Sequence, residues 1–402
     1  MSALTYWLWL SGVSGLGAAN IARLLDDFGS PEAVYFADEA EFDRYEKIQP
    51  GARAALRDKS TERVELALER CDLEGVGVLT MQDALYPERL KQIYDPPAVL
   101  YTKGRLAALD ELPLLTVVGS RTYTPYGADV ARRMCYQLAE AGMTIVSGMA
   151  KGIDAYALHG ALKAEGMTVA VLGGGPDVIY PAENRELYRQ ICETGLILSE
   201  YPPGTEPKAE HFPVRNRVMA ALSLGTLVIE ANLRSGALIT ARLAADQGRD
   251  VFCVPGSILT PESAGCHELI KNGAALVTSH ADILREYMPL FPHKITLVEG
   301  KAPARAFAAS PPPPPSRRAG PRRHGEPEEK PAAKKPPAPP DHLTDAQRVI
   351  YLSVGGGPRA VDDIVADTGL TAADILRALT MLEIEGLVET APGKRFKLRI
   401  ES

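Results

Sequence analysis

The sequence lacks the features that mark a disulfide framework, a zinc site or a membrane span. Its five cysteines (Cys71, Cys135, Cys192, Cys253 and Cys266) are scattered, with no Cys-x-x-Cys pair and no ligand-like spacing to histidine. The apolar segment 3–10 is too short to cross a bilayer and has neither a basic start nor a small-residue cleavage site. We therefore expect a cytoplasmic protein with reduced thiols, no metal and no membrane association.

The common signatures of nucleotide-dependent and hydrolytic enzymes are also missing. The chain has no Gly-x-x-x-x-Gly-Lys-Ser/Thr phosphate loop, no Gly-x-Ser-x-Gly elbow and no His-Glu-x-x-His helix. A Gly-x-Gly-x-x-Gly turn is absent after the first predicted strand, and Gly173–Gly175 follows the third strand without the right continuation. The sequence thus predicts a protein that is not an enzyme and needs no cofactor.

The overall charge does not favour binding to a polyanion. The chain carries 44 Lys and Arg against 51 Asp and Glu, a net charge of -7. Net negative charge repels nucleic acid at long range. If this protein binds a nucleic acid, its cations must be gathered in one place.

Residues 1–110 are predicted to be helical. The segment GVSGLG at 12–17 precedes an apolar helical pattern that ends at a Gly-Ser-Pro stop, residues 29–31. A glycine turn between two short helices resembles a helix-hairpin-helix or SAM-like unit, whose backbone N–H groups could hold a phosphate. A plain helical hairpin, in which glycine only permits the tight turn, explains the same pattern.

Residues 111–290 alternate between buried strands and helices of about a dozen residues. The predicted strands are Leu114–Val118, Thr144–Ser147, Val169–Leu172, Leu196–Ser199, Thr226–Glu230 and Val251–Val254. Continuous apolar strands separated by helices indicate a parallel sheet that is covered on both faces. The predicted fold class is α/β, a doubly wound, Rossmann-like domain.

Two further regions follow that domain. Residues 300–341 are predicted to be a disordered linker, because thirteen of the 32 prolines lie between 303 and 340 among Arg and Lys. Residues 342–402 predict three helices and a hairpin, a winged helix. Its third helix carries Asp374, Glu383 and Glu385 against Arg377 alone, so contact with protein fits it at least as well as contact with DNA.

Loops rich in glycine, in hydroxyl-bearing residues and in basic residues follow the predicted strands. The first is Gly119–Ser120–Arg121, where Gly lets a backbone approach closely and Arg makes a forked contact with phosphate. Comparable groups follow later strands, and all are expected along one edge of the sheet. The candidate binding residues are Gly119, Ser120, Arg121, Ser147, Gly148, Lys151, Gly152, Arg215, Asn216, Arg217, Arg234, Ser235 and Gly236. Such a row of cations is longer than one mononucleotide needs and fits successive phosphates.

Eight ordered motifs give the sequence a specific resemblance. They are GSR at 119–121, SGMAKGIDAYALH at 147–159, GGGPDVIYPAEN at 173–184, SEYPPG at 199–204, FPVRNRVMAALS at 212–223, EANLRSGALITA at 230–241, VPGSI at 254–258 and SAGCHELIKNGA at 263–274. Over residues 112–285 the chain resembles the DNA-processing protein A (DprA/Smf) family. The resemblance implies that the Rossmann-like domain binds single-stranded DNA, protects it and recruits the RecA recombinase in natural transformation. It also implies a SAM-like N-terminal domain, a C-terminal winged helix and a homodimer.

The resemblance also implies roles for single residues. Arg121 and Lys151 should meet DNA phosphates, and Arg215, Arg217 and the Arg234–Ser235–Gly236 turn should extend the groove. Four polar residues should orient loops. Asp154 and Glu230 should orient cations and loops rather than catalyse, and Asp177 and Asn184 should fix the third loop by local hydrogen bonding.

Two alternatives from other classes remain open. A nucleotide phosphoribohydrolase uses a similar sheet with a PGGxGTxxE loop, whereas residues 254–257 offer only VPGS. A transcription regulator would read DNA with the winged helix, which the acidic third helix argues against. The mediator interpretation is preferred, with a nucleotide-binding enzyme second.

Overall fold

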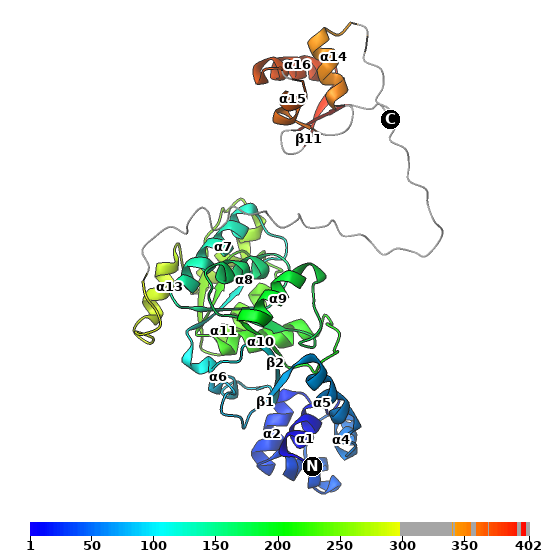
Figure 1. The fold of residues 1–402 in the computed structure, drawn as a ribbon, viewed down its shortest axis with the longest axis vertical. Coiled ribbons are helices and arrows are strands. Elements are labelled where there is room, and N and C mark those ends of the chain that lie inside the picture. Colours follow the sequence, from blue (N-terminus) through cyan, green and yellow to red (C-terminus); the bar gives the residue numbers. More distant parts are fainter. Residues whose placement is uncertain (298–339, 341, 355–358, 369, 392–394, 399–402) are drawn as a thin grey trace, which may run out of the picture. The chain divides into compact units, whose positions relative to one another are not determined.

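The computed structural model describes residues 1–297, 340, 342–354, 359–368, 370–391 and 395–398 (Figure 1). The chain divides into two compact units, Met1–Pro315 and Ser316–Ser402, and each is described by itself. The predicted linker over residues 300–341 lies outside the described residues, apart from Pro340. Within the described ranges, no helix is long and apolar enough to cross a membrane, and no group of His, Cys, Asp and Glu could hold a metal ion.

The first part of the chain is helical and packs around an aromatic cluster. Its helices are α1 (Ala3–Ser11), α2 (Ala18–Phe28), α3 (Pro31–Phe36), the 3₁₀ helix η1 (Glu39–Arg44), α4 (Pro50–Arg57) and α5 (Glu62–Glu74). The rings of Trp9 and Tyr35 meet edge to face with their centroids 4.9 Å apart, and Tyr6 packs on the same tyrosine at 5.1 Å. Ring pairs of this kind add to the burial of apolar surface and stabilise the cluster.

The turn between α1 and α2 requires glycine. Gly15 and Gly17 adopt φ values of 75° and 69°, a backbone region that other residues rarely enter. Helix α2 then begins without a side-chain cap. A tight helical turn therefore accounts for both glycines, and phosphate binding at this turn stays a prediction.

The prediction that residues 1–110 are helical is wrong over 77–104. Strands β1 (Gly77–Thr80) and β2 (Val99–Gly104) pair antiparallel with each other, and β2 also pairs antiparallel with β6 (Leu196–Ser199). The short helix α6 (Glu88–Lys91) lies between them in the sequence. Both strands precede the alternation of strands and helices over residues 111–290, by which the predicted strands were recognised. The predicted domain boundary at residue 110 is not tested further and stays a prediction.

A nine-stranded sheet, described in full, forms the centre of the first unit in the order β1-β2-β6-β5-β4-β3-β7-β8-β9. Its other strands are β3 (Leu114–Val118), β4 (Thr144–Ser147), β5 (Thr168–Leu172), β7 (Gly225–Val228), β8 (Asp250–Cys253) and β9 (Ala275–Leu276). All neighbouring pairs from β6 to β9 are parallel. The predicted parallel strands are confirmed, with ends that differ by one or two residues.

Helices cover both faces of this sheet and form two separate cores. One core takes side chains from α7 (Pro125–Glu140), α8 (Ile153–Lys163), α9 (Arg185–Thr194) and α13 (His280–Tyr287), the other from α6, α10 (His211–Leu222), α11 (Ala237–Asp246) and α12 (Ala264–Lys271). Three 3₁₀ helices lie in the connections, η2 (Leu109–Glu111), η3 (Ala182–Asn184) and η4 (Pro261–Ser263). A parallel sheet enclosed by two helical layers is the predicted doubly wound, Rossmann-like fold.

The strand order reverses beside β3, which lies between β4 and β7. The register pairs Leu115 with Gly225 and Val118 with Val228, so β3 and β7 end at the same level. Open α/β sheets bind their ligands outside the carboxyl ends of the strands at such a switch point. The loops after β3 and β7 therefore frame the place where a ligand is expected.

The described residues of the second unit form three helices and a small sheet. Its elements are α14 (Asp345–Val354), β10 (Arg359–Ala360), α15 (Val361–Thr368), α16 (Ala372–Ile384), β11 (Val388–Ala391) and β12 (Arg395–Leu398). The strands pair antiparallel in the order β10-β12-β11. Thr371 begins α16 by accepting a hydrogen bond from the Asp374 N–H at 3.3 Å. Three helices and a hairpin make the predicted winged helix.

Candidate nucleic-acid interface

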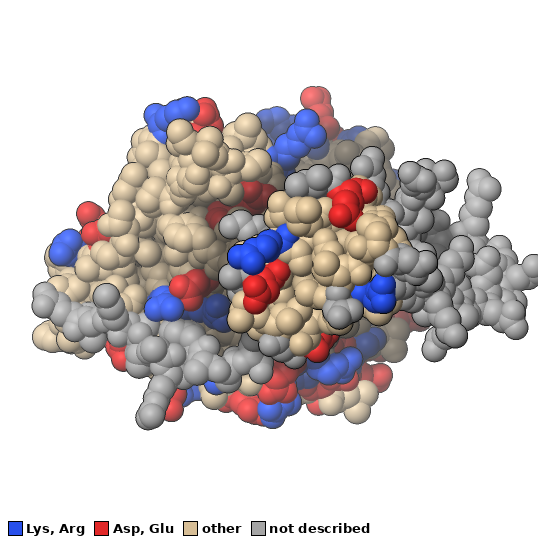
Figure 2. All heavy atoms as spheres, turned by 90° about the horizontal axis from the view of Figure 1, so that it is seen from above, with Lys and Arg blue, Asp and Glu red and all other residues tan. Residues whose placement is uncertain are grey.

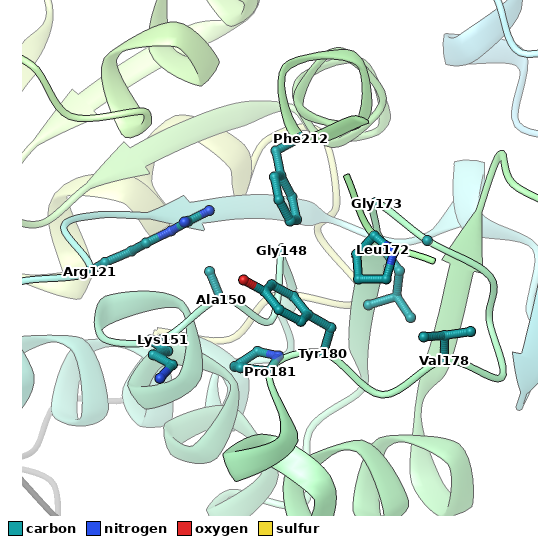
Figure 3. A pocket seen from close by; sticks show the side chains of 12 residues that line it. Arg121, Gly148, Ala150, Lys151, Leu172, Gly173, Val178, Tyr180, Pro181 and Phe212 are labelled. Atoms are coloured by element: carbon teal, nitrogen blue, oxygen red, sulfur yellow. The ribbon is translucent and has the colours of Figure 1, made fainter. Parts of the chain in front are cut away.

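A groove lies at the switch point and consists of two adjoining recesses. The open recess is lined by residues of the loops after β3 and β7 and of α10, and has a volume of about 670 Å³. The inner recess is lined by the loops after β4 and β5 (Figure 3). Five residues line both recesses and join them: Arg121, Ala150, Tyr180, Pro207 and Phe212. The open recess alone falls within the ~300–1,000 Å³ of small-ligand sites, so volume alone does not separate a nucleotide from a longer chain.

The charges outside the groove are mixed. On the face shown in Figure 2, the described Lys and Arg side chains are interspersed with Asp and Glu. A surface of this kind provides no strong positive field at a distance. This face therefore adds little long-range attraction for a polyanion.

Arg121 lies where the two recesses meet. Its guanidinium carbon is 5.2 Å from the centroid of the Phe212 ring (Figure 3). Arg121 is exposed, and within the described part of the chain no carboxylate forms an ion pair with it. Gly119 leaves no room for a larger residue, because a Cβ there would lie 2.6 Å from the Ile153 side chain. Ser120, beside it, is buried and accepts a hydrogen bond from the Thr122 N–H at 3.1 Å.

The loop after β4 brings backbone and one cation to the inner recess. Ser147 is buried and donates to the Val117 carbonyl at 2.6 Å, so its hydroxyl faces the sheet and not the groove. Gly148 and Gly152 allow close packing, and Gly152 has a φ of 85°. Lys151 lines the recess, and its Nζ lies 2.6 Å from Oε1 of Glu183. Both side chains of this ion pair are about half exposed.

Arg215 shapes the groove from inside. Its side chain is buried, and Nη1 donates to the carbonyls of Gly148, at 2.8 Å, and of Val171. Nε donates to Oδ1 of Asn216 at 3.1 Å. Burial lowers the pKa of Arg215 to about 10, while Asp154 acts in the opposite direction. Arg215 and Asn216 line the open recess, but the guanidinium bonds to the loop after β4 and to the end of strand β5.

The expectation that Arg217 lies in the groove is wrong. Its Nε is 3.1 Å from Oδ2 of Asp95, and its Nη2 is 2.6 Å from Oε2 of Glu200. The Arg217 side chain is 6% exposed and lines neither recess. Residues two apart on a helix point about 200° apart, so Arg217 leaves α10 on the side opposite to Arg215.

The turn after β7 provides the third part of the groove. Arg234, Ser235 and Gly236 all line the open recess. Arg234 is exposed, and its N–H donates to Oδ1 of Asn232 at 2.9 Å. Ser235 Oγ accepts a hydrogen bond from the Ala237 N–H, at the start of α11. Hydrogen bonds from backbone N–H groups to the Asn232 and Ser235 side chains thus hold the turn, and the Arg234 side chain stays at the surface.

The four polar residues predicted to orient loops all bond to loop backbone or to a cap. Oε2 of Glu230 accepts from the Thr124 N–H at 2.9 Å, and Asn184 donates to the Met149 carbonyl at 2.8 Å. Asp177 accepts from the Gly204 N–H at 2.7 Å. Burial raises the pKa of Asp154, and the charges of Arg215 and Arg121 oppose that shift. Of these four residues, only Asp154 lines the groove.

Two aromatic residues of the groove were quoted in the motifs but not selected from the sequence. Tyr180 and Phe212 have ring centroids 5.8 Å apart and line both recesses. Arg121 lies on Phe212 from one side, as Figure 3 shows. Exposed rings beside cations are the usual stacking surface for unpaired bases. The sequence did contain a signal for both rings, because Tyr180 lies in the loop after a predicted strand and Phe212 shortly precedes Arg215.

Comparison with known proteins identifies the family. A model of DNA recombination-mediator protein A matches residues 77–288, which is more than half of the 402 residues. The chain belongs to the DNA recombination-mediator protein A (DprA/Smf) family. A second model, of the DprA winged helix domain, matches residues 334–394 of this DprA/Smf chain.

Relatives of the family align over most of the DprA/Smf chain. Protein Smf of Synechocystis sp. is 36% identical over 402 residues, which cover 99% of both chains. DNA processing protein DprA of Streptococcus pneumoniae is 49% identical over 205 residues, 51% of this chain and 72% of that one. The X-ray structure of the pneumococcal DprA superposes with a TM-score of 0.62 at 39% identity, and covers 70% of this chain and 97% of its own. Membership gives the chain a DNA-processing, recombination-mediating role.

Proposed function

We propose that the protein is a single-stranded DNA-binding recombination mediator without catalytic activity, which protects incoming DNA and loads the RecA recombinase during natural transformation. One observation carries the DNA-binding part. Arg121 lies over the half-buried ring of Phe212, which packs beside the exposed ring of Tyr180 where the two recesses join. A guanidinium beside aromatic rings offers a phosphate contact and a stacking surface together. RecA loading, the homodimer and the cytoplasmic location rest on the family resemblance.

The extent of the groove favours a strand over a mononucleotide. Lys151 lines the inner recess, Arg121 lies at the junction, and Arg234 lines the open recess. Three cations along one continuous groove match successive phosphates of a flexible strand. Because most of the affinity would come from counterion release, binding should weaken steeply as salt concentration rises.

A binding comparison tests the proposed function. A fluorescently labelled single-stranded oligonucleotide is titrated with the full-length protein at several salt concentrations, with unlabelled single strand, duplex and free nucleotides as competitors. The single strand should compete best and the free nucleotides weakly. If a free nucleotide competes as well as the oligonucleotide, the nucleotide-binding enzyme becomes the better interpretation. If the duplex competes best, the groove is not the main DNA site.

Replacing Phe212 with alanine should weaken single-strand binding by about 1–3 kcal/mol, the usual contribution of one stacked base. No charge is removed, so the dependence of affinity on salt should keep its slope. Phe212→Tyr is the matched control, because it retains a ring, and its affinity should stay close to that of the wild type. Equal affinity of Phe212→Ala and wild type in the anisotropy titration would exclude stacking on this ring.

Replacing Glu183 with glutamine should tighten single-strand binding. The Glu183 carboxylate pairs with Lys151 and would repel a phosphate in the inner recess. Exposed ion pairs contribute up to about 1 kcal/mol, so we expect affinity to rise by about threefold and the salt slope to steepen as Lys151 is released. Glu186→Gln, on α9 outside the groove, is the control for lost negative charge. Unchanged or weaker binding by Glu183→Gln would show that Lys151 does not meet DNA.

A further inference from the structure

We propose that helix α5 of the N-terminal helical part fixes one wall of the groove through the ion pair between Arg70 and Asp177. Arg70 is then a positioning residue for DNA binding, although it does not touch the DNA. The proposal rests on the proposed function for its effect on affinity. Its structural part, the fixing of the wall, can be tested without DNA.

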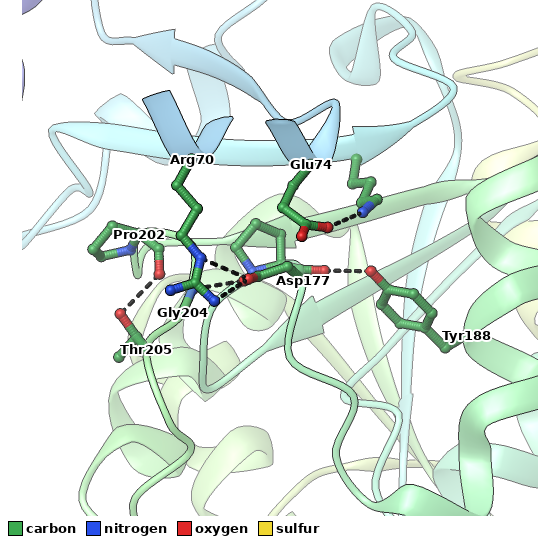
Figure 4. A network of polar contacts seen from close by, with 9 residues as sticks. Arg70, Glu74, Asp177, Tyr188, Pro202, Gly204 and Thr205 are labelled. Atoms are coloured by element: carbon green, nitrogen blue, oxygen red, sulfur yellow. Dashed lines mark hydrogen bonds and ion pairs between the residues drawn. The ribbon is translucent and has the colours of Figure 1, made fainter. Parts of the chain in front are cut away.

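Asp177 is the point at which the helical part meets the groove wall. Its carboxylate is 5% exposed and has two partners, the Gly204 backbone and the Arg70 guanidinium (Figure 4). Oδ1 accepts from the Gly204 N–H at 2.7 Å, and Oδ2 lies 3.2 Å from Nε and 3.1 Å from Nη2 of Arg70. A carboxylate this well buried is costly without a cationic partner, so Arg70 stabilises the position of Asp177.

Asp177 joins two loops, residues 173–181 and 201–207, which we call the wall loops. The Gly175 N–H donates to the Thr205 carbonyl at 2.8 Å, and the Thr205 hydroxyl donates to the Pro202 carbonyl at 2.8 Å. Tyr188 of α9 donates to the carbonyl of Pro176 at 2.5 Å. These bonds are local to the two loops and α9. The contact of Asp177 with Arg70 connects them to α5 (Figure 4).

Close packing leaves the wall loops little freedom at this point. Gly204 has a φ of 81°, and a Cβ there would lie 2.1 Å from Nη1 of Arg70. A Cβ at Gly175 would lie 2.7 Å from Oδ1 of Asp177. Both glycines thus allow the arginine, the carboxylate and the loop backbone to approach one another closely.

The wall loops reach the groove within a few residues of Asp177. Gly173, Gly174, Val178 and Tyr180 from the first loop, and Pro207 from the second, line the inner recess. Tyr180 is also one of the two rings that we expect to stack on a base. Arg70 lines neither recess. We therefore expect Arg70 to affect DNA binding through the wall loops and not by direct contact in the groove.

A second contact seats α5 on the sheet. Oε2 of Glu74, one turn beyond Arg70, lies 3.3 Å from Nζ of Lys103 on β2 (Figure 4). The helix is thus held on β2 by one ion pair and on the wall loops by another. Removal of Arg70 should release the wall while α5 stays in place.

Hydrogen–deuterium exchange and DNA binding of full-length Arg70→Ala, Arg70→Lys and Arg189→Ala test the proposal. Arg189 is an exposed arginine of α9 with carboxylate partners, so its removal controls for the lost charge. In Arg70→Ala, peptides covering 173–181 and 201–207 should exchange faster in the free protein, with unchanged exchange in α1 to α4. Affinity for a single-stranded oligothymidylate should fall by about tenfold, as expected for about 1.4 kcal/mol. The salt slope should not change, and Arg70→Lys should restore part of the affinity.

Each other result counts against the proposal in a different way. Unchanged exchange in the wall loops of Arg70→Ala rejects the structural part. Faster exchange with wild-type affinity rejects the positioning role. A salt slope lowered by about 0.7 means that Arg70 itself contacts a phosphate. If the wild-type protein binds no oligonucleotide, the proposed function fails and positioning for DNA fails with it, while exchange alone still decides whether Arg70 fixes the wall.

Discussion

Replacing both Arg121 and Lys151 with alanine is expected to weaken binding of single-stranded DNA by about 3 kcal/mol, or about a hundredfold. Hydrogen bonds to charged groups contribute at least about 1.5 kcal/mol each, and tenfold in affinity corresponds to about 1.4 kcal/mol. Each phosphate contact with a single strand adds about 0.7 to the slope of log affinity against log salt. The double variant should therefore also lower that slope, by at most about 1.4 because Lys151 is paired with Glu183 in the free protein.

The fold should not suffer in this double variant, because both side chains are exposed. Thermal unfolding of the variant and the wild type should coincide. Arg133→Ala with Arg189→Ala is the matched control: it removes two exposed arginines, from α7 and α9, that lie outside the groove and pair with carboxylates. The control pair should bind nearly as well as the wild type. If both double variants lose affinity equally, only net charge matters and the groove assignment fails.

Arg217→Met is expected to cause a large loss of stability and to leave the salt slope of DNA binding unchanged. This is the opposite of what is expected for the double variant of Arg121 and Lys151. The substitution leaves two carboxylates, Asp95 and Glu200, without their shared cation. Loss of one partner from a buried ion pair costs about 3–5 kcal/mol. Asp95 is 37% exposed, so the lower end, about 3 kcal/mol, is expected in urea unfolding at neutral pH.

The pH dependence of this loss follows from the carboxylates. Burial raises the pKa of both Asp95 and Glu200, and Arg217 opposes the shift in each. Without Arg217 both pKa values rise further above those of the unfolded chain. A raised carboxylate pKa destabilises the folded state at neutral pH, and the destabilisation is relieved as pH falls through that pKa. The difference in unfolding free energy between variant and wild type should therefore shrink at pH values below neutral.

Arg217→Lys separates charge from geometry in the same experiment. It keeps a cation between the two carboxylates and should recover part of the stability. A stable Arg217→Met protein with weakened DNA binding and a lower salt slope would instead place Arg217 on the DNA. That result would contradict the position of this side chain outside the groove.

The parallel sheet was predictable from the sequence because each of its longer strands is a continuous apolar run between helical patterns. β3 and β5 are buried along their whole length, and burial on both faces is what makes such a run visible. β1 was missed because it lies before the alternating strand and helix patterns of residues 111–290 by which strands β3 to β8 were recognised. Its position depends on pairing with β2, a contact that no local pattern contains.

The edge of the sheet at which the groove lies was predictable, but the direction of each side chain was not. Strand-end loops must meet at one edge of a parallel sheet, so the positions of Arg121 and Lys151 follow from topology. Arg215 and Arg217 were both predicted to extend the groove, although helical geometry already separates positions two residues apart. The Arg215 guanidinium donates to the carbonyls of Gly148 and Val171. This contact depends on tertiary packing and was not predictable from the motif.

The ion pair between Arg70 and Asp177 shows what sequence reasoning could not reach. The two residues are 107 positions apart and belong to different parts of the first unit. Asp177 was assigned to local hydrogen bonding, and its bond with the Gly204 N–H is of that kind within the wall. Its cationic partner comes from helix α5, which lies outside all eight motifs.

The path of the DNA is tested most directly by photocrosslinking. A single-stranded oligonucleotide that carries iodouracil at every second position is irradiated with the full-length protein, and crosslinked peptides are identified by mass spectrometry. Crosslinks should concentrate at Tyr180 and Phe212 and disappear in Arg121→Ala with Lys151→Ala. Crosslinks that lie mainly in α14 to α16 or in residues 316–339, and that persist in the double variant, would contradict binding in the groove.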